Sequence, residues 1–157
     1  MSQTPARCLI LACGNTLRGD DGVGLWLAEW AERHFSTQAG VRVIADHQWT
    51  PELAEDVART ESVLFIDCSV DSLPGSVTLA PVEPVSSGPE HNTHHLGAAE
   101  LLALARELYG SLPANALSLT IGAGSTELGE VFSAPVSAAL PNVCTLMEET
   151  VQRLLRV

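Results

Sequence analysis

Two adjacent aspartates, Asp20 and Asp21, end a glycine-rich turn near the start of the chain. The turn lies in the segment GNTLRGDDGVG, from Gly14 to Gly24, which follows the apolar run RCLILAC. The first six residues of this segment have the glycine spacing of a phosphate-binding loop, but such a loop continues with a lysine and a hydroxyl residue. Because carboxylates repel phosphate, the turn predicts either a helix start capped by aspartate or a site for a cation.

A third aspartate and two histidines extend the cation hypothesis. Asp67 ends the apolar segment SVLFID, and His94 and His95 lie in the polar segment HNTHHLG ahead of a predicted helix. Loops at the carboxyl ends of parallel strands meet at one crevice, so we expect Asp21 and Asp67 to lie close together. Two carboxylates and one imidazole suit a divalent transition metal with coordination positions left open. Neighbouring side chains point apart, so only one of the two histidines can readily join such a site.

Other chemistries have weaker support in the sequence. There is no G-x-S-x-G elbow, no H-E-x-x-H helix and no G-x-G-x-x-G after the first predicted strand. Cys68 and Ser69 could act as nucleophiles, but neither has an evident partner. His47 also follows a predicted strand, although a capping or packing role fits it better. Simple helix capping by the aspartates stays open as the structural alternative.

Apolar runs alternate with helical patterns along the chain, which is typical of an α/β domain. We expect strands at residues 7–13, 41–45, 62–68, 76–82 and 116–122, and helices at about residues 21–34, 51–60, 97–108 and 135–155. Three of the strands are apolar on both faces, as buried parallel strands are. The last helix carries one apolar stripe that should face the sheet, formed by Val136, Leu140, Val143, Met147, Val151 and Leu154.

One connection departs from the parallel pattern. Only the segment SVDSLPG separates Cys68 from Ser76. A parallel crossover needs a dozen or more residues, so we expect the strand at 76–82 to run antiparallel to the strand before it. The predicted fold is therefore a three-layer α/β/α sandwich around a five-stranded, mostly parallel twisted sheet with one antiparallel strand.

Composition limits the class of protein and its partners. The 157 residues, 46% hydrophobic and 17% charged, predict one domain over residues 1–157 with a core of its own. The net charge of -11 argues against nucleic acid and anionic membranes as partners. The N-terminal apolar run is too short for a signal peptide, and no stretch of about twenty apolar residues is present, so we expect a cytoplasmic protein. The four cysteines form no C-x-x-C pair and predict buried free thiols.

Three segments together resemble one family. GNTLRGDDGVG, SVLFIDCSVDSLPG and THHLGAAELLALA occur in the order and spacing of the nickel-iron hydrogenase maturation endopeptidases, and GEVFSAPVSAALPNV near the end also resembles that family. The resemblance covers nearly the whole chain and implies the same α/β/α fold. It further implies a hydrolase, a metal-dependent endopeptidase that removes the C-terminal extension of a hydrogenase large-subunit precursor after nickel insertion. The implied partner is that precursor, and the chain is expected to be a monomer.

The resemblance also implies which residues act. By motif, the catalytic and nickel-binding positions are Asp21, Asp67 and His94, with the nickel supplied by the precursor and other divalent ions able to occupy the site in vitro. His94 is preferred over His95 because HLG matches the step that follows the family's histidine. A non-cleaving nickel-binding chaperone or checkpoint protein of hydrogenase assembly would use the same three residues and stays as the alternative. The sequence departs from many relatives after the second strand, where DHQWTPEL, from Asp46, replaces a DGGT turn, which leaves the identity of the partner hydrogenase open.

Overall fold

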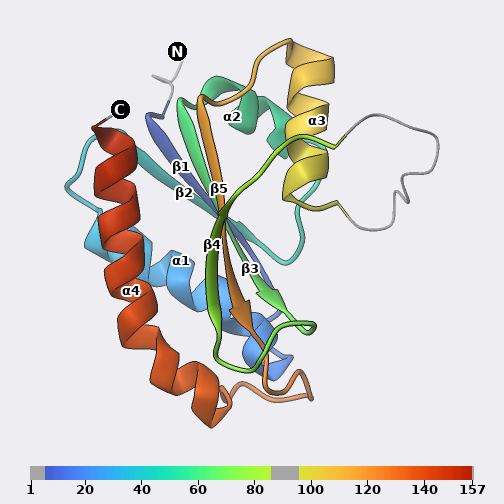
Figure 1. Cartoon of the computed structure of the whole chain (residues 1–157), viewed down its shortest axis with the longest axis vertical. Helices are drawn as coiled ribbons and strands as arrows, with labels where there is room; N and C mark the ends of the chain where they lie inside the picture. Colours follow the sequence, from blue (N-terminus) through green and yellow to red (C-terminus); the bar gives the residue numbers. More distant parts are fainter. Residues whose placement is uncertain (1–5, 86–95, 157) are drawn as a thin grey trace.

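The computed structural model describes residues 6–85 and 96–156. Its centre is a five-stranded sheet with the strand order β2-β1-β3-β5-β4 (Figure 1). Strands β1, β2, β3 and β5 are parallel. The strands span Cys8–Cys13 (β1), Val41–Asp46 (β2), Ser62–Ser69 (β3), Val77–Pro81 (β4) and Asn115–Gly122 (β5). Each lies within two residues of a predicted strand, so the strand predictions are confirmed.

Strand β4 is the antiparallel strand at one edge of the sheet. It pairs with β5, from Val77 opposite Ile121 to Pro81 opposite Leu117. The direction predicted from the short connection is therefore confirmed, but the neighbour of β4 is β5 rather than β3. The connection after β3 passes the end of β5, where the Gly75 N–H donates to the Gly122 carbonyl at 2.8 Å. Because this connection carries the chain past β5, it is β5 and not β4 that pairs with β3.

Helices cover both faces of the sheet. The short 3-10 helix η1 (Gly19–Gly22) leads directly into α1, and the predicted helix from Asp21 is thus divided into these two parts. Figure 1 shows α1 and α4 on one side of the sheet and α2 and α3 on the other. The α-helices span Val23–His34 (α1), Leu53–Arg59 (α2), Ala98–Tyr109 (α3) and Ala134–Leu155 (α4). The predicted three-layer α/β/α sandwich is confirmed.

Two hydrophobic cores lie on opposite faces of the sheet. On β1, Ile10 belongs to the core beneath α1 and α4, whereas Leu9 and Leu11 belong to the core beneath α2 and α3. This strand is buried on both faces, as its unbroken apolar run predicts. The stripe on α4 also packs toward the sheet: Val136, Val143, Met147, Val151 and Leu154 are buried, and Leu140 is half-buried against the same core. Burial on both faces fixes the strands, and with them the loops that follow their carboxyl ends.

The cysteines agree with the expectation in part. All four are free, but only Cys8 is fully buried, and Cys13, Cys68 and Cys144 are half-buried. Within residues 6–85 and 96–156, no helix combines the length and the hydropathy that crossing a membrane requires.

Candidate functional site

The site is built where two neighbouring parallel strands end. Strands β1 and β3 pair directly, and η1, which follows β1, contacts β3. Asp21 lies in η1, and Asp67 lies near the end of β3. Both residues are half-buried. The convergence of these two segments at the carboxyl edge is the one that the sequence predicts.

The turn that carries Asp21 closes on itself. The Asn15 N–H donates to Oδ2 of Asp21 at 2.9 Å and also contacts the Asp21 carbonyl at 3.2 Å. Gly14 makes this closure possible, because a Cβ at that position would lie 2.1 Å from the Asp21 carbonyl oxygen. Asp21 is thus held by the backbone at the start of its own turn, which limits the positions that its carboxylate can adopt.

Asp20 has a different environment from its neighbour. Its side chain is completely buried and accepts hydrogen bonds from the loop between β5 and α4. Oδ2 accepts from the Gly124 N–H (2.6 Å), the Ser125 N–H (2.9 Å) and the Ser133 hydroxyl (2.7 Å), while Oδ1 accepts from the Ser133 N–H (2.7 Å). Asp20 does not cap the helix that follows it, because η1 has no side-chain cap and the donors come from residues more than 100 positions away. It ties the aspartate turn to the loop before α4.

The charge of Asp20 is stabilised by these donors. Burial raises the pKa of this carboxyl, but the hydrogen bonds from Ser133, Ser125 and Gly124 outweigh burial and hold the pKa below its usual range. The ionised form is therefore the native form at neutral pH. An ionised carboxylate that accepts four hydrogen bonds acts here as a structural bracket, whereas Asp21, half-buried on the same turn, accepts only the Asn15 N–H among the hydrogen bonds described above.

The pKa values of two thiols, Cys13 and Cys68, indicate that Asp21 and Asp67 lie near each other. Burial raises the pKa of Cys13, and so do the charge of Asp67, a hydrogen bond to Asp67 and the charge of Asp21. Burial likewise raises the pKa of Cys68 to about 12, with further contributions from the charges of Asp21 and Asp67. The charges of both carboxylates thus affect the pKa of each thiol, and this requires both carboxylates to lie near that thiol.

These thiols are protonated at neutral pH, because their pKa values are raised rather than lowered. A cysteine nucleophile needs a lowered pKa and a cationic partner, and the neighbours of Cys13 and Cys68 include carboxylates instead. The possibility that Cys68 acts as a thiolate nucleophile therefore loses support. Asp67 also accepts a hydrogen bond from the Cys68 N–H at 2.7 Å, which orients its carboxylate.

The predicted histidine lies in a part of the chain that is not described. His94 and His95 are both in the segment 86–95, outside the described residues. Among the described residues, no three His, Cys, Asp or Glu side chains are grouped so that they could hold a metal ion. His47 is exposed beyond the end of β2, with its N–H on Oδ1 of Asp46 at 2.8 Å. Asp21 and Asp67 are thus the two predicted site residues that the structure places.

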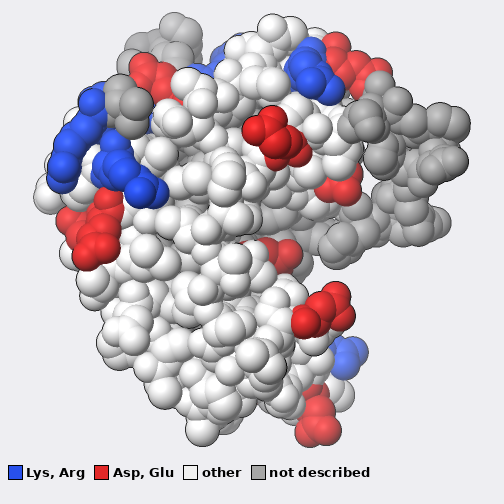
Figure 2. All heavy atoms as spheres, in the orientation of Figure 1, with Lys and Arg blue, Asp and Glu red and all other residues white. Residues whose placement is uncertain are grey.

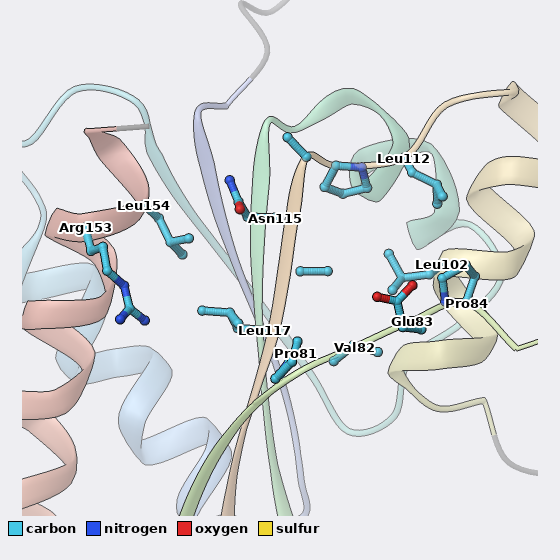
Figure 3. Close-up of a pocket in the computed structure, with 13 residues that line it drawn as sticks. Pro81, Val82, Glu83, Pro84, Leu102, Leu112, Asn115, Leu117, Arg153 and Leu154 are labelled. Carbon is cyan, nitrogen blue, oxygen red and sulfur yellow. The ribbon is translucent and has the colours of Figure 1, made fainter.

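The surface and the cavities distinguish the two edges of the sheet. Figure 2 shows acidic side chains on the side of the molecule where β3 ends. A cavity of about 550 Å³ lies instead at the opposite edge, between the end of β4, the start of β5, α3 and the last turn of α4 (Figure 3). Its lining is mainly apolar, with Glu83 and Arg153 as the charged residues. Because neither Asp21 nor Asp67 lines it, this cavity is separate from the candidate site.

Comparison with known proteins finds similar solved structures but no similar sequence family. No family profile matches the sequence, and a search of curated proteins finds none that is significantly similar. Among solved structures, the hydrogenase maturating endopeptidase HybD from E. coli is similar with a TM-score of 0.76 and 21% identity over 94% of this chain and 93% of that chain. The [NiFe] hydrogenase maturation protease HycI from Thermococcus kodakarensis KOD1 gives 0.69 and 24% identity over 97% and 94%. The protease HybD from Thermococcus kodakarensis gives 0.63 and 26% identity over 92% and 98%.

The likeness extends over nearly the whole length of each pair of chains. The chain therefore has the fold of the hydrogenase maturation endopeptidases, and the resemblance expected from its motifs is confirmed at the level of the fold.

Proposed function

We propose that this protein is an endopeptidase that removes the C-terminal extension of a nickel-iron hydrogenase large-subunit precursor after nickel has been inserted. The observation that carries the proposal is the convergence of Asp21 and Asp67 at the carboxyl edge of a sheet with this fold. The similar solved structures are named as maturation endopeptidases and proteases, which supports the same class of activity.

Nickel belongs to the substrate in this proposal. Carboxylate oxygens are suitable ligands for a divalent cation, and Asp21 in η1 and Asp67 near the end of β3 lie at the edge of the sheet that should face a docked precursor. The proposed third ligand is His94, by its match to the family's histidine. Each ligand would add to the coordination of an ion that the precursor already holds, so that a precursor without nickel would bind less well. Other divalent ions would compete for the same oxygens in vitro.

The two carboxylates support two courses for the hydrolysis. In the first, the nickel anchors the precursor and places the scissile bond beside the carboxylates. In the second, a metal-polarised water or carbonyl supplies the hydrolysis. In the metal-free protein, burial and the neighbouring carboxylates raise the pKa values of Cys13 and Cys68, which disfavours a cysteine nucleophile. In either course Asp21 and Asp67 are needed, because their charges hold the cation.

The test compares two forms of the precursor. The protein is incubated with nickel-loaded and with nickel-free large-subunit precursor, and the mass of the large subunit is measured afterwards by intact-protein mass spectrometry. We expect the nickel-loaded form alone to lose a C-terminal peptide. Binding of the loaded form without any loss of mass would instead identify a non-cleaving chaperone or checkpoint protein that reads nickel loading.

A further inference from the structure

Large apolar side chains are exposed around the candidate site. Among the described residues, the most exposed of them are Val131 (84%), Leu73 (79%), Leu128 (78%) and Val70 (70%), and Leu17 is 57% exposed. These five residues, here called the apolar rim, lie in the loops that follow β1, β3 and β5. All three loops are at the carboxyl edge of the sheet, beside Asp21 and Asp67. Exposed apolar side chains that gather around one site indicate a surface for a partner rather than scattered surface residues.

Hydrogen bonds fix the loop after β3 against the end of β5. The Gly75 N–H donates to the Gly122 carbonyl, and the Ala123 N–H donates to the Ser69 carbonyl, both at 2.8 Å. A Cβ at Gly75 would lie 2.7 Å from the carbonyl oxygen of Pro135, in the first turn of α4, so this loop also packs closely on α4. Val70 and Leu73 therefore project from a loop that is tied down at both ends.

The loop after β5 is fixed in the same way to the aspartate turn. The Gly19 N–H donates to the Gly129 carbonyl at 2.8 Å, and the Gly129 N–H donates to the Leu17 carbonyl at 2.9 Å. The buried carboxylate of Asp20 holds the remainder of this loop through its four hydrogen bonds. Leu128 and Val131 thus remain exposed on an ordered loop, which gives a pre-organised surface that loses little conformational freedom when it binds.

The charges beside the apolar rim are mainly acidic. Asp71, Glu127 and Glu130 are exposed within the same loops, and Arg18 is the cation that accompanies them. A second copy of this chain would bring the same acidic residues against themselves, in a protein whose net charge is already -11. An anionic membrane would be repelled for the same reason. The charge pattern therefore favours a protein partner with an apolar surface flanked by basic residues.

We propose that the apolar rim is the docking surface for the folded body of the large-subunit precursor, around the nickel that Asp21 and Asp67 recognise. This inference rests on the proposed function and adds to it the surface that binds the substrate away from the scissile bond. Leu73 and Leu128 are the contacts to test, because they are the exposed leucines of the loops that follow β3 and β5. The acidic residues of these loops speed association with a basic surface of the precursor.

The test uses a double variant and a matched control. Leu73→Gln/Leu128→Gln replaces two exposed leucines of the apolar rim without changing charge. Leu108→Gln/Tyr109→Gln replaces two exposed residues at the end of α3, away from the site. The dissociation constant for the nickel-loaded precursor is measured by biolayer interferometry, and cleavage is followed by intact mass. Far-UV circular dichroism and thermal melting confirm that each variant is folded.

We expect the rim variant to raise both the dissociation constant and KM by about tenfold or more, with kcat within about twofold of the parent. The control variant should match the parent, and added salt should slow association of the parent. If the rim variant binds and cleaves like the parent, the docking inference is wrong while the proposed function stands. If the parent binds the precursor without cleaving it, the proposed function fails. The dissociation constants of the two variants then still show whether the apolar rim is the docking surface. A parent that does not bind the precursor overturns the docking inference.

Discussion

At the residue scale, the two adjacent aspartates of the turn have separate roles. Asp20 is completely buried and satisfied by donors of the loop before α4, whereas Asp21 is half-buried and held by the Asn15 N–H. Neighbouring side chains point in different directions, so one turn can brace a distant loop and present a carboxylate at the same time. The charge of Asp20 therefore contributes to stability and that of Asp21 to the proposed recognition of nickel.

Replacing Asp20 with Asn should destabilise the protein. The amide keeps one oxygen, but its NH2 group faces an N–H or O–H group that now donates to Asp20, which leaves part-buried donors without an acceptor. We expect a loss of about 2–4 kcal/mol in the free energy of unfolding, measured by urea denaturation. Asp71→Asn, at an exposed position, should change it by less than about 0.5 kcal/mol and serves as the control. Equal stability of Asp20→Asn and the parent would contradict the bracket role.

Replacing Asp67 with Asn should abolish processing and leave the fold intact. The Asn oxygen can still accept from the Cys68 N–H, but the charge that a cation needs is lost. Repulsion with Asp21 is relieved in the metal-free protein, so its thermal midpoint should equal or exceed that of the parent. Cleavage of the nickel-loaded precursor and differential scanning calorimetry measure the two effects. Full cleavage activity in this variant would refute the assignment of Asp67.

The choice between the two adjacent histidines gives a third prediction. We expect His94→Ala to lose nickel-dependent cleavage and His95→Ala to retain most of it. A ligand histidine presents a neutral ring nitrogen to the metal and needs a hydrogen-bond partner on its other nitrogen, a geometry that only one of two neighbours can meet. Cleavage by both variants across a nickel titration checks this. An inactive His95→Ala variant together with an active His94→Ala variant would identify His95 as the ligand instead.

At the scale of elements, the path from β1 through η1 to α1 positions Asp21. The start of α1 approaches the end of β1 so closely that a Cβ at Gly24 would lie 2.3 Å from the Cys13 carbonyl oxygen. The turn therefore connects a strand and a helix whose backbones lie in close contact. The position of Asp21 relative to β3 depends on this close contact, since β3 pairs with β1.

Gly24→Ala tests this contact. Helix propensity alone would favour alanine in α1 by about 1 kcal/mol. Because the new methyl group would meet backbone at 2.3 Å, we expect instead a destabilisation of about 2 kcal/mol or more, with slower cleavage as the turn shifts. Gly110→Ala is the control: its surroundings are open and its φ is 66°, so it should cost about 1 kcal/mol and leave cleavage unchanged. A stabilised Gly24→Ala would contradict the close approach. Urea denaturation and the cleavage rate of both variants are the measurements.

At the scale of the whole molecule, charge and exposed apolar surface work together. The net charge of -11 opposes the self-association that the apolar rim would otherwise favour. The acidic residues of the same loops, Asp71, Glu127 and Glu130, add to that repulsion beside the apolar side chains. The surface is thus suited to a partner of opposite charge rather than to a second copy.

We therefore predict that the isolated protein is a monomer of 16.6 kDa at moderate salt. Sedimentation equilibrium measures the mass directly. High salt should screen the repulsion and promote weak self-association. If self-association does occur, Leu73→Gln/Leu128→Gln should suppress it, and Leu108→Gln/Tyr109→Gln should not. A stable dimer at low salt would show that charge does not keep the copies apart.

The sequence by itself determined the elements and the edge of the sheet at which the candidate site lies. The unbroken apolar runs specified buried strands, the spacing of apolar residues specified α4, and the short segment after Cys68 specified the antiparallel direction of β4. Such signals are contained within a few consecutive residues, because strand and helix periods repeat over short distances. They sufficed to place Asp21 and Asp67 together.

Only the tertiary structure decided what depends on residues far apart in the chain. The donors to Asp20 come from positions 124, 125 and 133, more than 100 residues after it, and nothing near Asp20 in the sequence distinguishes it from Asp21 as the buried one. The role of the Ser133 hydroxyl could not be predicted from the sequence either, since its acceptor is that distant carboxylate. The place of β4 beside β5 and the order of the loops that carry the apolar rim were also fixed by the packing of the sheet. The physical reason is that a buried carboxylate is stabilised by whichever donors the topology brings to it, and the pairing of strands decides which loops meet.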